Sequence, residues 1–109
     1  MRLLALCTLP VCLLAAAEFR QHTIATGLKG GYQVVAADLN KDGKPDLIAL
    51  ASGLTELVWF ENPGWQRHVL AAGVSRPINL AVSAPRPDGI PTIVLAQEFS
   101  MDPQQSAGI

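Results

Sequence analysis

Short apolar runs separated by turn residues make up much of the chain after residue 30. Four runs follow one another: Val34–Ala37, Leu47–Ala51, Leu57–Phe60 and Arg67–Leu70. Turn residues such as Ser52-Gly53 and Asn62-Pro63-Gly64 lie between them at hairpin spacing, which is typical of short antiparallel strands. The first three runs are continuously apolar, a pattern that predicts strands covered on both faces. No helical period appears beyond the first seventeen residues, so the sequence predicts an all-β fold.

The chain matches itself at an offset of 46 residues without a gap. The aligned segments are 19–27 with 65–73, Asp42-Gly43-Lys44-Pro45 with Asp88-Gly89-Ile90-Pro91, and Leu47-Ile48 with Ile93-Val94. Each identity is weak alone, but the shared offset keeps aromatic and aliphatic positions in phase. We therefore interpret the chain as two units of one repeat, about 19–64 and about 65–109.

Four short strands per unit, buried on both faces and repeated along the chain, describe the blades of a β-propeller. Small residues such as Ala36, Ala37, Ala49 and Ala51 suit crowded inner strands. We expect about two four-stranded antiparallel blades, the second incomplete. A seven-bladed ring at this period needs about 320 residues. The sequence is therefore expected to be an N-terminal fragment of a longer protein that supplies the remaining blades.

Residues 1–17 have the pattern of a signal peptide. Arg2 gives a positive start, Leu3–Leu14 form an apolar core, and Ala15-Ala16-Ala17 offer a cleavage site. The core is shorter than the about 20 residues of a membrane-spanning helix. We expect a mature chain of residues 18–109 without a membrane span, secreted or located in the periplasm or at the cell surface. An uncleaved anchor or a lipoprotein signal remains an alternative.

Cysteine and charge content limit the chemistry of the mature chain. Both cysteines, Cys7 and Cys12, lie in the signal segment, so neither disulfides nor thiolate metal sites are expected. Removal of Arg2 leaves seven basic and nine acidic side chains, with no run of either sign. This balance predicts no nucleic-acid partner and no attraction to an anionic membrane.

The loop Asp38-Leu39-Asn40-Lys41-Asp42-Gly43-Lys44-Pro45-Asp46 follows the first apolar run. Oxygen-bearing side chains stand at its positions 1, 3, 5 and 9, and Gly43 stands at position 6. Calcium takes six to eight oxygen ligands, and glycine allows the sharp turn that aims successive side chains inward. The spacing therefore predicts a calcium-binding loop.

This strand–loop–strand pattern, Asp-x-Asn-x-Asp-Gly-x-x-Asp between apolar runs, resembles the FG-GAP or VCBS-type repeat. The segment Trp59-Phe60-Glu61-Asn62-Pro63-Gly64-Trp65 also resembles sequences of bacterial secreted proteins of this kind. The resemblance covers residues 19–99 and implies an integrin-α-like β-propeller with Ca²⁺ in a hairpin loop. It implies five ligands: the side chains of Asp38, Asn40, Asp42 and Asp46 (the last bidentate) and the main-chain carbonyl of Lys44. Mg²⁺ is disfavoured because it requires tighter octahedral geometry.

The spacing of this loop resembles two other kinds of loop. An EF-hand or dockerin-type loop needs an acidic ligand at position 12, where this chain has Ala49 within a β-like run. The EF-hand interpretation is therefore rejected. An ordinary Asn/Asp/Gly hairpin turn without an ion stays open.

The second repeat has lost most of these ligands. Ala84, Arg86 and Thr92 stand where the first loop has Asp38, Asn40 and Asp46, and only Asp88-Gly89 is kept. We expect this segment to form a turn without calcium, which leaves one metal site.

The remaining candidates favour packing over catalysis. His22 and His68 share the repeat offset, and Ser75 and Ser83 lack a nucleophile motif. A glycosidase-like pair of Asp42 and Asp46 is explained better by ion coordination. We therefore expect no catalytic residues in the chain.

The aromatic residues Trp59 and Phe60 are expected to pack between blades, with Trp65 more open. A sugar-binding platform is the alternative use of these rings. We predict a secreted calcium-binding repeat module with a structural, adhesive or ligand-binding role and an unspecified protein or carbohydrate partner. The competing hypothesis is the N-terminal part of a larger secreted propeller enzyme, a dehydrogenase or hydrolase, with its catalytic residues elsewhere.

Overall fold

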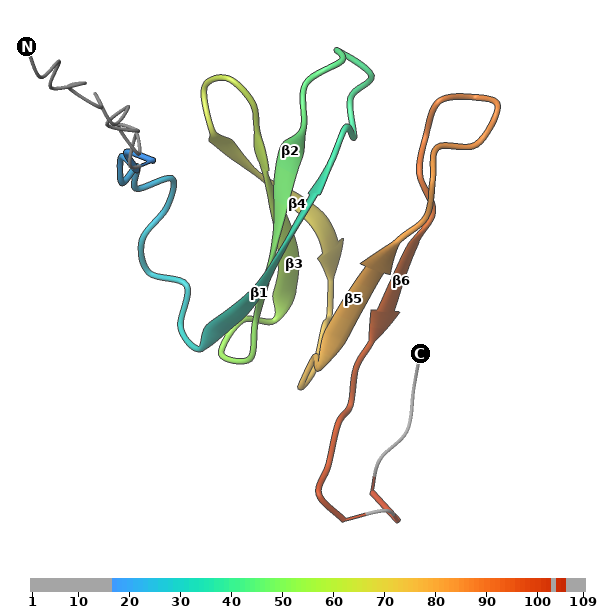
Figure 1. The fold of residues 1–109 in the computed structure, drawn as a ribbon. Coiled ribbons are helices and arrows are strands. Elements are labelled where there is room, and N and C mark those ends of the chain that lie inside the picture. The colour runs from blue at the N-terminus through green and yellow to red at the C-terminus, as the bar shows by residue number, and fades with distance from the viewer. Residues whose placement is uncertain (1–16, 103, 106–109) are drawn as a thin grey trace, which may run out of the picture.

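The computed structural model describes residues 17–102, 104 and 105, so the predicted signal peptide lies outside the described residues apart from Ala17. The described part contains six strands: β1 (Gly31–Ala37), β2 (Asp46–Ala51), β3 (Glu56–Glu61), β4 (Gln66–Ala72), β5 (Asn79–Val82) and β6 (Ile93–Ala96) (Figure 1). Within these residues no helix is long and apolar enough to cross a membrane. The predicted all-β fold is confirmed.

Strands β1 to β4 form one antiparallel sheet in the order β1-β2-β3-β4. Each strand contains one of the four apolar runs that the sequence predicts, because β-branched and aromatic side chains suit a pleated, half-buried surface. The register places Ala49 opposite Val34 on one side and opposite Val58 on the other. The predicted four-stranded first blade is therefore confirmed.

Strands β5 and β6 form a separate two-stranded antiparallel sheet that lies beside the first one (Figure 1). They occupy the positions that the 46-residue offset assigns to them, since Asn79 corresponds to Gln33 in β1 and Ile93 to Leu47 in β2. Among the described residues the second unit contains these two strands, against four in the first sheet. The two sheets are partial β-propeller blades, and the sequence repeat is a structural repeat.

The N-terminal segment departs from the repeat. Residues 65–73 contain β4, whereas the aligned residues 19–27 form no strand. The physical reason is the absence of a partner: β4 is hydrogen-bonded to β3, and no described strand lies beside 19–27. An isolated extended segment leaves its backbone groups to water.

Strand β1 of the first unit and strand β5 of the second are joined through the side-chain amide of Gln33. Its Nε2 donates to Asn79 Oδ1 at 2.9 Å and to the Leu80 carbonyl at 3.0 Å, while Leu80 N donates to Gln33 Oε1 at 2.8 Å. The neighbouring Tyr32 hydroxyl donates to the Pro77 carbonyl. Burial raises the pKa of Tyr32 above its ordinary value of 10.0. These contacts fix how β1 lies against the second unit.

The main core fills the space between the two sheets. Its buried members come from β2, β3, β5 and the β4–β5 connection: Ile48, Leu50, Leu57, Val74 and Leu80. Side chains from β1 and β6, among them Val35 and Ile93, pack against this cluster. Alternate residues of β2 therefore face the second unit, as the two-residue period of a strand requires.

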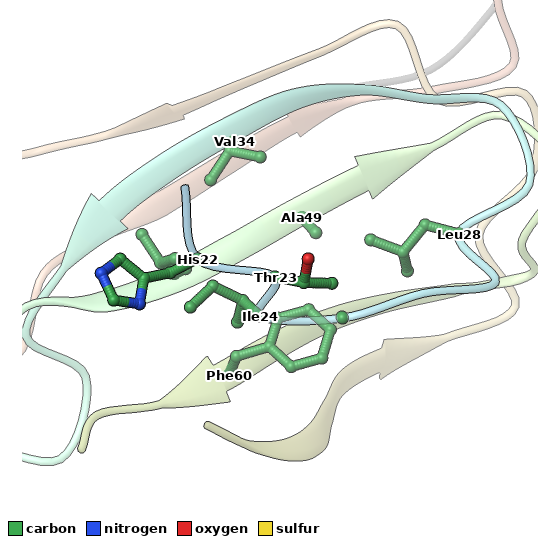
Figure 2. Close-up of a pocket in the computed structure, with 9 residues that line it drawn as sticks. His22, Thr23, Ile24, Leu28, Val34, Ala49 and Phe60 are labelled. Carbon is green, nitrogen blue, oxygen red and sulfur yellow. The ribbon is translucent and has the colours of Figure 1, made fainter. Parts of the chain in front are cut away.

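The opposite face of the first sheet carries a smaller core of Ala49, Val58 and Phe60. The segment around Ile24 crosses it, and Figure 2 shows this segment passing beside Ala49 and Phe60. Trp65 is half-buried and packs against the same cluster, whereas Trp59 packs against the main core.

A cavity of about 250 Å³ remains under this segment. Its lining is mostly apolar, with His22 and Thr23 as the polar members (Figure 2).

The prediction that β1 is covered on both faces is wrong, because Val34 is 63 % exposed. Strand β1 is the edge of its sheet, and the N-terminal segment covers β2 and β3 more fully.

Candidate metal centre

The loop between β1 and β2 wraps around the carboxylate of Asp38. Its Oδ1 accepts the amide N–H groups of Lys41 at 2.8 Å and Asp42 at 3.2 Å, and its Oδ2 accepts that of Gly43 at 2.9 Å. Short polar side chains commonly hold nearby backbone amides in this way. A single side chain therefore directs three consecutive N–H groups toward the inside of the loop.

Two further side chains extend this arrangement along the loop. Asn40 Oδ1 accepts the N–H of Asp42 at 3.1 Å, and Asp42 Oδ1 accepts the N–H of Lys44 at 2.9 Å. The chain adopts left-handed torsions at Lys41 (φ 65°) and Gly43 (φ 81°). The predicted turn at Gly43 is confirmed, whereas the strained torsion of Lys41 had no signal in the sequence.

Asp46, the last of the predicted ligands, lies fully buried at the base of the loop. Its Oδ2 accepts the N–H of Leu39 at 2.9 Å, and its Oδ1 accepts the N–H of Asn62 at 2.9 Å. A buried carboxylate is stable only when its oxygens are hydrogen-bonded or paired. Asp46 thereby ties the start of its own loop to the turn between β3 and β4.

The β3–β4 turn forms a second wall of the site, which the sequence analysis did not identify. Asn62 Nδ2 donates to the Pro45 carbonyl at 3.0 Å, and Glu61 Oε1 accepts Asn40 Nδ2 at 2.9 Å. Both residues follow a predicted strand, but only the order of strands in the sheet shows that they lie beside the loop Asp38–Asp46. The candidate centre is therefore built from two loops of the same blade.

Glu61 is also held from the other side. Its Oε2 lies 2.8 Å from His68 Nε2, and the His68 ring stacks on Trp59 with centroids 4.5 Å apart and planes at 22°. The structural role predicted for His68 agrees with these contacts. His22, its counterpart in the repeat, lines the apolar cavity instead.

The side-chain oxygen atoms of this loop are of the kind that bind a calcium ion. Its acceptors are the carboxylate and amide oxygens of Asp38, Asn40, Asp42 and Asp46, which are hard ligands suited to Ca²⁺. Each carboxylate offers about four lone pairs, and the amide contacts occupy three on Asp38, one on Asp42 and two on Asp46. Acceptor capacity therefore remains on all three carboxylates.

The carboxylates are not gathered around one point. Within residues 17–102, 104 and 105, no three His, Cys, Asp or Glu side chains form a group that could hold a metal ion. Asp38 and Asp42 are engaged by backbone amides near the loop tip, and Asp46 by amides at its base. Ion binding therefore requires these carboxylates to move together.

The corresponding segment of the second unit keeps the turn. Gly89 has the same φ of 81° as Gly43, and its N–H donates to the Arg86 carbonyl at 2.8 Å. Asp88 Oδ1 accepts the N–H of Ile90 at 3.0 Å, and Asp88 Oδ2 lies 3.3 Å from the Arg86 guanidinium. The predicted turn is confirmed, and a cationic side chain lies where the first loop has Asn40.

One known protein family matches the part of the chain that contains the first loop. The family model of the FG-GAP repeat matches residues 30–60, which contain β1, the loop, β2 and most of β3. Searches of curated proteins and of solved structures gave no match. The resemblance deduced from the loop spacing is confirmed for residues 30–60.

Proposed function

We propose that this chain is a secreted β-propeller module of the FG-GAP type whose first blade binds Ca²⁺ in the loop Asp38–Asp46. Its role is structural, adhesive or ligand-binding, toward a protein or carbohydrate partner. The observation that carries the proposal is the loop itself: three oxygen-bearing side chains hold its backbone in a closed turn, and a fourth is buried at its base. An ordinary hairpin turn does not require a fully buried carboxylate.

In this proposal the ion is held by the side chains of Asp38, Asn40, Asp42 and Asp46 and by the Lys44 carbonyl. Calcium supplies positive charge among carboxylates that repel one another. The residues of the chain supply the framework, since Asp38 orders the loop tip and Asp46 connects the base to Asn62. Calcium thereby rigidifies the β1–β2 hairpin, and a rigid hairpin presents a fixed surface to a partner.

The contacts of the polar residues support a role without catalysis. His68 is stacked on Trp59 and bonded to Glu61, as expected of a packing residue. Asp42 and Asp46 accept hydrogen bonds from backbone amides, as expected of residues that hold a loop. The secreted location is proposed from the signal-peptide pattern of residues 1–17.

Calcium titration of the full chain tests the proposal. We expect one binding event by isothermal titration calorimetry. At a free calcium concentration one hundred times Kd, the ion should stabilise the fold by about 2.7 kcal/mol relative to chelator. Asp42→Asn should weaken binding strongly, because it replaces an anionic ligand by a neutral one.

The matched control is Asp88→Asn, the same chemical change at the equivalent position of the second repeat. This variant should bind calcium like the wild-type chain. Identical thermal melting of the wild-type chain in calcium and in chelator, with no heat of binding, would show that the loop is an ordinary turn.

A further inference from the structure

Glu61 lies outside the loop, and its carboxylate is hydrogen-bonded to the side chain of Asn40, a proposed calcium ligand. Its Oε1 accepts Asn40 Nδ2 at 2.9 Å. We propose that Glu61 is a positioning residue that orients the Asn40 amide so that its oxygen faces the inside of the calcium loop. This inference rests on the proposed function, since it specifies how one ligand of that site is set.

The orientation of an asparagine amide is a two-fold choice, because its oxygen accepts and its nitrogen only donates. A cation binds only the oxygen. In the structure Asn40 Oδ1 accepts the N–H of Asp42 at 3.1 Å while Nδ2 donates to Glu61. Rotation of the amide by half a turn would set its oxygen against the Glu61 carboxylate and its NH₂ against the Asp42 N–H. Both contacts therefore select the orientation that calcium requires.

Glu61 can act in this way because the sheet holds it in place. It ends β3, and its Oε2 lies 2.8 Å from Nε2 of His68 in β4. His68 pairs with Trp59 across the two strands and stacks on its ring. The next residue, Asn62, donates its N–H to Asp46 at 2.9 Å. The position of a loop ligand is thus set from a neighbouring hairpin, as groups behind a metal ligand often set its orientation.

The same contact gives a physical reason for asparagine at position 3. An aspartate at residue 40 would place a second carboxylate against Glu61, and two like charges at this distance repel. Asparagine donates to Glu61 and still offers an oxygen to the ion. Residues 40 and 61 therefore act as a pair, and the effect of a change at one depends on the other.

Three variants of the full chain test this role. Glu61→Ala removes the acceptor of the Asn40 amide and should weaken calcium binding tenfold to about a hundredfold, the usual effect of removing a group that orients a ligand. Glu61→Gln keeps an oxygen for Asn40 Nδ2 and should bind calcium within about threefold of wild type. Glu56→Ala is the matched control, since Glu56 begins the same strand and pairs with Arg67 on the surface.

A metal-free measurement tests the contact itself. In ¹H–¹⁵N spectra recorded with chelator, the hydrogen bond to Glu61 should shift one of the two Asn40 side-chain NH₂ resonances downfield and slow its exchange with water. Glu61→Ala should return that resonance to the position of a solvent-exposed asparagine and speed its exchange, and Glu61→Gln should keep it shifted. An Asn40 signal that does not respond to Glu61→Ala would overturn the proposal without any calcium measurement.

A double-mutant cycle keeps the test decisive if Glu61→Ala does not fold. Asn40→Asp should improve calcium binding more in the Glu61→Gln background than in the wild-type background, because the repulsion has been removed. Equal effects in the two backgrounds would contradict the pairing of residues 40 and 61.

If Glu61→Ala binds calcium as tightly as the wild-type chain, the positioning role of Glu61 is overturned alone. A wild-type chain that binds no calcium overturns the proposed function together with it.

Discussion

Replacing Asp46 by alanine removes the one fully buried charged side chain among the described residues. The carboxylate accepts the N–H groups of Leu39 and Asn62, both at 2.9 Å. In metal-free buffer the substitution leaves these two donors without their acceptor, at about 1–3 kcal/mol each. Because both residues are only half-buried, water can replace part of the loss. We therefore expect a loss of about 2–4 kcal/mol in the free energy of unfolding.

Urea denaturation followed by tryptophan fluorescence in the presence of chelator measures this loss. Trp59 and Trp65 lie in or beside the hairpin that Asp46 anchors, so their emission reports its unfolding. Asp46→Asn should cost about 1–3 kcal/mol, because one oxygen still accepts a hydrogen bond while the new NH₂ opposes the other donor.

The control is Asp88→Ala in the second repeat, where the carboxylate is about half exposed at 51 % of its side-chain surface. This variant should cost no more than about 1 kcal/mol. If Asp46→Ala costs as little as Asp88→Ala, the buried carboxylate does not hold the two hairpins together and the reasoning fails.

Three further predictions concern the fold. Gly43→Ala should cost about 1–2 kcal/mol from its φ of 81° alone, since an added Cβ meets no atom within 4 Å, whereas Gly64→Ala should change little; urea midpoints distinguish them. Ile48→Val should cost about 1 kcal/mol because Ile48 is 1 % exposed, and Val34→Ala, at a 63 % exposed site, no more than about 0.5 kcal/mol by the same assay. The raised pKa of Tyr32 favours its protonated form in the folded state, so its contribution is complete below about pH 10 and is lost as the pH rises through the folded value. Tyr32→Phe should remove that alkaline loss in a pH series of unfolding free energies, and an unchanged profile would contradict it.

The strand pattern was predictable because each strand carries its own local signal. The apolar runs after Gln33, Asp46 and Glu56 became β1, β2 and β3, and the 46-residue offset located β5 and β6 despite their shorter runs. The exposure of Val34 was not predictable, because the same apolar run fits a covered strand and an edge strand equally well. Segment 19–27 shows the same limit, since its likeness to β4 does not create a partner for it.

The sequence by itself determined the chemistry of the candidate centre. Four oxygen donors at fixed spacing around Gly43 are a property of nine consecutive residues, and the turn they predict depends only on local torsions and nearby amides. Only the tertiary structure decided what holds that loop in place. Glu61 and Asn62 lie 15 or more residues beyond Asp46, and they reach the loop because the sheet places the β3–β4 hairpin beside it. His68 contacts Glu61 from the neighbouring strand. A contact of this kind depends on strand order and register, which no local pattern of residue types contains.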